Sequence, residues 1–195
     1  MATLIQPIEC RMRQFLKCHP DSPLGAAAQI EVEIVHLSAS GLKLSYRVTG
    51  KMSDIRMPAV AATTRGEELW QHTCFEAFVR ASSGAAYYEF NFSPSTQWAA
   101  YRFDGYRSGR SVPAEIGAFA IDVQETPERY ALQTSLELGR LSGLPQNGPW
   151  RLGLSAIIEE ASGRKSYWAL AHPPGKPDFH HADCFAHEIS LAVPP

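Results

Sequence analysis

The chain has 195 residues, of which 45% are hydrophobic and 19% charged, and 18 Lys+Arg against 20 Asp+Glu give a formal net charge of −2. This apolar content excludes a disordered chain, which requires low hydrophobicity and high net charge. The balanced charge argues against a nucleic acid partner, because neutralising phosphates requires a clustered basic surface.

The start of the chain has no basic segment followed by an apolar run, so the sequence predicts no secretory signal. No window approaches the roughly 18 continuous apolar residues of a membrane span. We therefore expect a cytoplasmic protein with no membrane partner. Cys10, Cys18, Cys74 and Cys184 are widely spaced and are expected to be free thiols, with a Cys10–Cys18 disulfide as the alternative for an exported chain.

An irregular N-terminal segment is expected over 1–27, followed by a core over 28–192 within a single domain. Alternating apolar and polar residues over 30–34 and 42–48, with Ser40-Gly41 between them, predict a hairpin. Further strands are expected over 70–80, 87–92, 97–103, 118–124, 130–138, 150–159, 166–170 and 185–191. About ten short strands at this spacing predict an all-β fold, an antiparallel β-sandwich.

The sequence lacks the usual linear signatures of several enzyme classes. It contains no phosphate-binding loop, no Gly-x-Gly-x-x-Gly, no Gly-x-Ser-x-Gly and no His-Glu-x-x-His. The absence of alternating strands and helices also argues against a dinucleotide-binding fold.

Three consecutive predicted strands carry polar or aromatic side chains on one face each. These residues are Glu76 on the first strand, Glu89 and Asn91 on the second, and Trp98 and Arg102 on the third. If the strands are neighbours, the carboxylates, amide, guanidinium and indole form a surface suited to a sugar. The alternative is a solvated outer face on which the carboxylates pair with Arg102. Glu76 stands out, because it lies in the most apolar part of its strand and a buried carboxylate needs a partner.

A second group of chemically active residues lies in the proline-rich segment 166–185, where three histidines, two aspartates and one cysteine fall within 172–184. Three interpretations stay open. The segment is a ligand-contacting loop that brings Trp168, Lys176 and His180 over the sheet. Otherwise it holds a transition metal, or its polar side chains cap its own backbone.

Several segments resemble one known group of proteins: Leu69-Trp70, Cys74 to Val79, Tyr87 to Pro94, Trp98 to Tyr101, and Lys176 to His180. Together they resemble bacterial DOMON-like proteins, which are related to the carbohydrate-binding modules of family 9. The resemblance covers roughly 28–192 and is strongest from Trp70 to Arg107. It implies an antiparallel β-sandwich whose relatives bind sugars or haem.

The resemblance also implies particular site residues. Glu76 matches the glutamate of the sugar-binding modules directly, and Asn91, Trp98 and His180 match more loosely. In the sugar-binding modules an aspartate pair precedes this glutamate. The matching positions here hold Gln71-His72-Thr73, so the resemblance does not carry over the aspartate pair or a calcium site that depends on it. For haem, Met52 or Met57 with His172 would stand in for the axial ligands.

These observations predict a non-catalytic domain that binds a carbohydrate or a sugar-derived metabolite, without a required cofactor. The predicted ligand-binding residues are Glu76, Glu89, Asn91, Trp98, Arg102, Trp168, Lys176 and His180. One alternative is a haem- or metal-binding domain. Another is a hydrolase in which Glu76 or Glu89 acts as general acid or base, with a histidine from 172–181 as partner.

Overall fold

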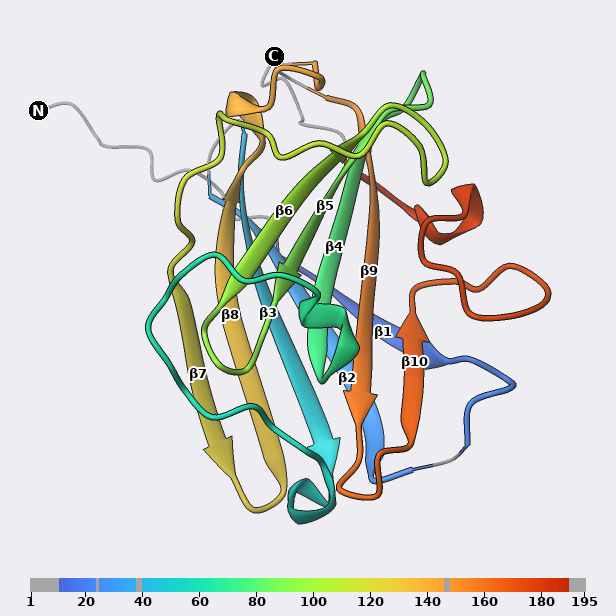
Figure 1. Ribbon diagram of the computed structural model, residues 1–195. Coiled ribbons are helices and arrows are strands. Elements are labelled where there is room, and N and C mark those ends of the chain that lie inside the picture. Colours follow the sequence, from blue (N-terminus) through green and yellow to red (C-terminus); the bar gives the residue numbers. More distant parts are fainter. Residues whose placement is uncertain (1–10, 24, 38–39, 146–147, 190–195) are drawn as a thin grey trace, which may run out of the picture.

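A computed structural model describes residues 11–23, 25–37, 40–145 and 148–189 (Figure 1). The strands are β1 (Arg11–Cys18), β2 (Ala27–His36), β3 (Gly41–Gly50), β4 (Cys74–Ala81), β5 (Tyr87–Phe92), β6 (Trp98–Phe103), β7 (Ile121–Thr126), β8 (Arg129–Glu137), β9 (Trp150–Glu159), β10 (Lys165–Ala169) and β11 (His187–Ile189). Four single 3-10 turns connect them: η1 (Met52–Asp54), η2 (Leu69–Gln71), η3 (Leu138–Arg140) and η4 (Ala182–Cys184). The predicted all-β class is confirmed.

All pairings between these strands are antiparallel, in the order β6-β5-β4-β9-β10-β1-β2-β3-β8-β7, with β11 on β9. The sheet curls over itself, so that β6, β5, β4, β9 and β10 form one layer and β2, β3, β8 and β7 the other (Figure 1). We call the first of these the site layer. Strand β1 joins the two layers, because it pairs with β2 over most of its length and with β10 at Lys17 and Cys18.

The main core fills the space between the layers. In the hairpin β2–β3, the apolar side chains of the alternating pattern all point inward, and each is at most 1% exposed. They are Ile30, Val32, Ile34, Leu42, Leu44, Tyr46 and Val48. Burying these side chains, together with Phe75, Trp150 and the rest of the core, drives the closure of the sandwich.

The prediction of an irregular segment over 1–27 is wrong for Arg11–Cys18, which is a regular strand. Met12 and Leu16 pack toward the core, and Arg13 faces Glu31 and Glu33 on β2 at 3.7 and 3.6 Å. Residues 1–10 lie outside the described residues, and so does the Cys10 half of the proposed disulfide. Cys18, Cys74 and Cys184 are free.

The outer side of the site layer is partly covered as well, because the segment between β10 and β11 packs against it. Phe179 and Phe185 of this segment join Phe78 and Tyr87 in a second apolar cluster. Gly153 on β9 permits the close approach, since a Cβ there would lie 3.0 Å from the backbone oxygen of Cys184. Within the described residues, no helix is long and apolar enough to cross a membrane.

Candidate ligand-binding site

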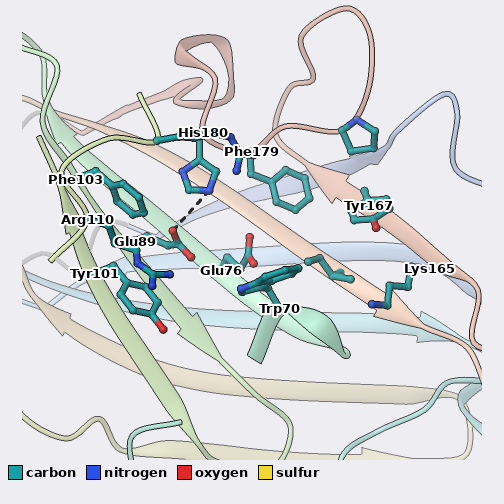
Figure 2. Close-up of a pocket in the computed structure, with 13 residues that line it drawn as sticks. Trp70, Glu76, Glu89, Tyr101, Phe103, Arg110, Lys165, Tyr167, Phe179 and His180 are labelled. Atoms are coloured by element: carbon teal, nitrogen blue, oxygen red, sulfur yellow. Dashed lines mark ion pairs between the residues drawn. The ribbon is translucent and has the colours of Figure 1, made fainter. Parts of the chain in front are cut away.

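A cavity of about 480 Å³ opens on the outer face of the site layer (Figure 2). This volume lies within the usual range for small-molecule sites. The cavity is lined by Trp70, Glu76, Glu89, Tyr101, Phe103, Arg107, Arg110, Ile157, Lys165, Tyr167, Pro177, Phe179 and His180. Its floor therefore comes from strands and its walls from the loops before β4, after β6 and after β10.

Strand register brings the polar floor residues together. Glu76 on β4 lies directly opposite Asn91 on β5 and Ser155 on β9. Glu89 on β5 lies opposite Tyr101 on β6. Because side chains opposite each other point to the same face, these groups form one continuous surface. In Figure 2 the two carboxyl groups lie between Tyr101 and Arg110 on one side and Tyr167 and Lys165 on the other.

Glu76 is held as a buried carboxyl group that is 3% exposed. The hydroxyl of Ser155 donates a hydrogen bond of 2.9 Å to its Oε2. Burial raises the pKa of Glu76 to about 8, and the neighbouring charge of Glu89 acts in the same direction. The Ser155 hydrogen bond and the more distant Arg107 oppose this rise. At neutral pH Glu76 is therefore mostly protonated and can donate a hydrogen bond as well as accept one.

Glu89 is 6% exposed and has two polar neighbours. The amide of Asn91 donates to its Oε1 at 2.6 Å, and Nε2 of His180 lies 3.8 Å from its Oε2 (dashed line in Figure 2). Burial raises the pKa of Glu89, although the Asn91 hydrogen bond and the positive charges of Arg107 and Arg110 oppose the shift.

His180 is a neutral imidazole that is fixed in orientation. Burial lowers its pKa to about 4, and the charge of Arg107 lowers it further while Asp178 opposes. Its Nδ1 lies 2.7 Å from the hydroxyl of Tyr87, which itself accepts the backbone N–H of Arg107 at 3.2 Å. A neutral imidazole carries one ring proton, so His180 acts as a donor through one nitrogen and as an acceptor through the other. The contact with Glu89 joins a neutral ring to a carboxyl group and is not an ion pair at neutral pH.

Aromatic rings form the walls of the cavity. The indole of Trp70, on η2, is the most exposed of them at 46%. Two guanidinium groups contact the ring of Tyr101, with Arg65 at 5.4 Å and Arg110 at 5.0 Å from its centre. Phe179 lies over the β10 side of the cavity, with its ring centre 6.2 Å from that of Tyr167.

Arg107 and Asp178 form the wall between this cavity and a neighbouring hollow. The guanidinium of Arg107 contacts Oδ1 of Asp178 at 2.8 Å, and the hydroxyl of Tyr106 also donates to this carboxylate. Arg107 has a φ of 50°, in the left-handed region that non-glycine residues rarely adopt. Lys176 is exposed and lines the neighbouring hollow, outside the cavity that holds the glutamates.

The structure therefore brings together four of the eight residues predicted from sequence: Glu76, Glu89, Asn91 and His180. Asn91 supports Glu89 from beside the cavity and does not line it.

Trp98, Arg102 and Trp168 were assigned to the wrong surface. Trp98 is 7% exposed and lies in the core, where its ring packs edge to face against Phe119 at 5.0 Å. Trp168 is also 7% exposed in the core, and its Nε1 donates to the hydroxyl of Ser166. Arg102 pairs with Asp104 at 2.7 Å. The face of β6 that carries Trp98 continues the inward face of β5, so the opposite face of β6 reaches the site.

Sequence reasoning missed most of the walls. The missed lining residues are Trp70, Tyr101, Phe103, Arg107, Arg110, Ile157, Lys165, Tyr167, Pro177 and Phe179. Trp70 stands at the start of the motif that carries the family resemblance, and Tyr167 alternates with the buried Trp168. The sequence therefore contained a signal for both residues. Arg107 and Arg110 come from a loop without periodicity, so no sequence pattern indicated them.

The metal and haem alternatives find no matching geometry in the described part of the chain. No three His, Cys, Asp or Glu side chains gather there as a metal site. Nε2 of His172 donates to the backbone oxygen of Lys17 at 2.8 Å, while Met52 is buried in the core and Met57 packs against it. These residues do not fit a pair of axial haem ligands.

Comparison with solved structures gives similar folds. A provisionally named carbohydrate-binding protein from Bacteroides uniformis shares 15% identity, with a TM-score of 0.64 over 89% of this chain and 83% of that one. Two family 9 carbohydrate-binding module structures from Caldicellulosiruptor kristjanssonii also match. The one with cellotriose has 12% identity and a TM-score of 0.49 over 84% and 74% of the two chains. The one with glucose has 15% identity and a TM-score of 0.42 over 82% and 76%.

Comparisons with protein families and with curated proteins find no match for this sequence. The structural similarities concern the fold, so the relationship to DOMON-like proteins and the bacterial origin stay predictions.

Proposed function

We propose that the protein binds a carbohydrate or a sugar-derived metabolite in this cavity, without chemical conversion. The observation that carries the proposal is the pair of buried carboxyl groups, Glu76 and Glu89, at the floor of a cavity with a half-exposed indole at its wall. Carboxyl groups hydrogen-bond the hydroxyls of a sugar, and an aromatic plane packs against the C–H face of its ring. The similar fold of the carbohydrate-binding protein from Bacteroides uniformis supports the proposal.

Each group has a distinct role in this proposal. Protonated Glu76 donates to one sugar hydroxyl and accepts from another, Glu89 accepts from a hydroxyl on the adjacent strand's side, and Trp70 stacks on the ring. His180 orders Glu89 and closes the cavity above it. The side chains that carry these groups are fixed by strand register and by the Tyr87 contact, so the site is formed before the ligand arrives.

Isothermal titration calorimetry against a panel of mono- and disaccharides tests this function. We expect saturable binding of at least one sugar, with a ligand-dependent rise in melting temperature. A Trp70→Ala variant should lose this binding while an exposed aromatic elsewhere, replaced in Phe15→Ala, leaves it unchanged. A panel without any heat of binding or melting shift at millimolar ligand contradicts the proposal.

A second candidate function is hydrolysis of a glycosidic bond, which one observation favours. Glu76 keeps its proton at neutral pH beside a second carboxyl group, as a general acid requires. Chromogenic glycosides test this candidate: turnover that the Glu76→Gln variant abolishes supports it. Saturable sugar binding without turnover rejects hydrolysis and leaves the binding function.

A further inference from the structure

We infer that the ligand is an acidic sugar, such as a sugar acid or a sugar phosphate, and that Arg110 and Lys165 contact its negative charge. The inference rests on the proposed function and names the class of sugar that the same cavity takes. It is based on which charged side chains around the cavity form ion pairs within the protein and which do not.

Arg110 is a cation at the wall of the cavity without an ion-pair partner among the residues that the structure describes. Its guanidinium lies 5.0 Å from the centre of the Tyr101 ring, which holds it in place. The acid nearby, Glu67, is already engaged, because it pairs with Arg65 and accepts the hydroxyl of Tyr101 at 2.6 Å. Arg110 is therefore positioned by a ring, and the carboxyl groups of Glu67 and Glu89 act on it without a close ion pair.

Lys165 is a second such cation, at the start of β10. It lies directly opposite Glu159 on β9. The two oxygens of Glu159 are taken, however, by Arg56 at 3.0 Å and by His72 at 2.7 Å. Within 11–23, 25–37, 40–145 and 148–189, the ammonium of Lys165 makes no hydrogen bond or ion pair.

Within the described residues, the two glutamates at the floor of the cavity make no close ion pair with Arg110 or Lys165. Burial raises the pKa of both Glu76 and Glu89, and for Glu76 the value reaches about 8, so Glu76 keeps its proton at neutral pH and can donate a hydrogen bond to an anionic oxygen. The third cation that lines the cavity, Arg107, is paired with Asp178. The cavity thus presents two cations that make no close ion pair, on either side of the two buried carboxyl groups (Figure 2). A neutral sugar would leave both cations without a counter-charge.

Calorimetry with matched ligands tests the inference: glucose, glucuronate, glucose 1-phosphate and glucose 6-phosphate. We expect at least one acidic sugar to bind about tenfold or more tightly than glucose, because hydrogen bonds to charged groups contribute more than neutral ones. The preference should shrink as salt is added, since both cations reach solvent. Arg110→Gln and Lys165→Gln should each lower the affinity for the acidic sugar by a larger factor than the affinity for glucose, and so reduce the preference.

Two controls remove the same charges elsewhere. Arg129→Gln and Lys43→Gln lie on β8 and β3 of the opposite layer, and we expect both to keep the preference of the unmodified protein. Equal affinity for glucose and every acidic sugar overturns this inference but leaves the proposed function intact. Inorganic phosphate that binds as tightly as the sugar phosphates also overturns it, because the sugar ring would then contribute nothing. Failure of every sugar to bind removes the proposed function itself.

Discussion

Glu76 holds its proton because little around its carboxyl group stabilises a negative charge. The only hydrogen bond to it within the described residues comes from the Ser155 hydroxyl. From β3, the hydroxyl of Tyr46 donates to the backbone oxygen of Glu76 and not to its side chain. From β4, the buried thiol of Cys74 has a pKa raised by burial and carries no charge that would help, and from β5 Glu89 raises the pKa of Glu76, while Arg107 is the distant cation. An acid in this setting is costly to ionise, which is typical of a site kept for function.

This proton makes stability depend on pH in a defined direction. Between the ordinary value of 4.5 and about 8, the unfolded chain has released the proton of Glu76 and the native state has kept it. The free energy of unfolding therefore falls as pH rises through this window, by up to about 1.4 kcal/mol per pH unit, and levels off above it. His180, whose pKa is lowered from 6.5 to about 4, acts in the opposite direction below pH 6.5.

We expect the Glu76→Gln variant to lose this slope. Urea denaturation at pH 6.5 and pH 8 measures it, and the variant should gain stability relative to the unmodified protein as pH rises. Glu125→Gln, an exposed position on β7, is the control and should follow the unmodified protein. A stability difference between Glu76→Gln and the unmodified protein that stays constant over this range would show that Glu76 is ionised in the native state.

Tryptophans on the two faces of the site layer should respond differently to substitution. Trp70→Ala removes a half-exposed ring, so we expect sugar affinity to fall about tenfold or more with a change in unfolding free energy of about 0.5 kcal/mol or less. Trp98→Ala removes a core ring and should cost about 3–5 kcal/mol. If a folded Trp98→Ala protein lost sugar binding while Trp70→Ala kept it, Trp98 and not Trp70 would be the tryptophan that contacts the ligand.

At the scale of elements, the alternation of apolar and polar residues predicted where most strands lie. It predicted less reliably which face of each strand points to the core. The hairpin β2–β3 has one face in the core and one toward solvent, so its pattern is clear. The site layer is covered on both faces, and apolar residues then occur on either side of a strand. On β6 both faces carry aromatic residues, so the pattern did not indicate that Tyr101 points outward. Trp98 was therefore wrongly predicted to lie in the site. On β1 the exposed Phe15 interrupted the alternation, so the strand was missed.

The segment that covers the site layer depends on one missing side chain, that of Gly153. A Cβ at this position would lie 3.0 Å from the Cys184 oxygen and 3.4 Å from the Cβ of Phe78. We expect Gly153→Val to displace the segment, to cost about 1–3 kcal/mol in stability, and to weaken sugar binding through Phe179 and His180. Gly117→Ala, where a Cβ meets nothing within 4 Å, is the control. Unchanged affinity in Gly153→Val would show that the cover does not position the cavity.

For the whole molecule, β1 is the connection that makes one sheet of two layers. Because its pairing with β10 is limited to Lys17 and Cys18, most of the coupling between the layers passes through the shared core. We expect the layers to unfold together, so that urea transitions followed by far-UV and near-UV circular dichroism coincide. Two separate transitions would show that the layers are independent units.

The unequal burial of the four tryptophans has a practical consequence. Trp98, Trp150 and Trp168 are at most 7% exposed, whereas Trp70 is 46% exposed at the wall of the cavity. A water-soluble fluorescence quencher such as iodide therefore reaches one indole far more readily than the other three. A ligand that covers Trp70 shields it, so the natural protein carries its own optical reporter of occupancy and can be screened without a label.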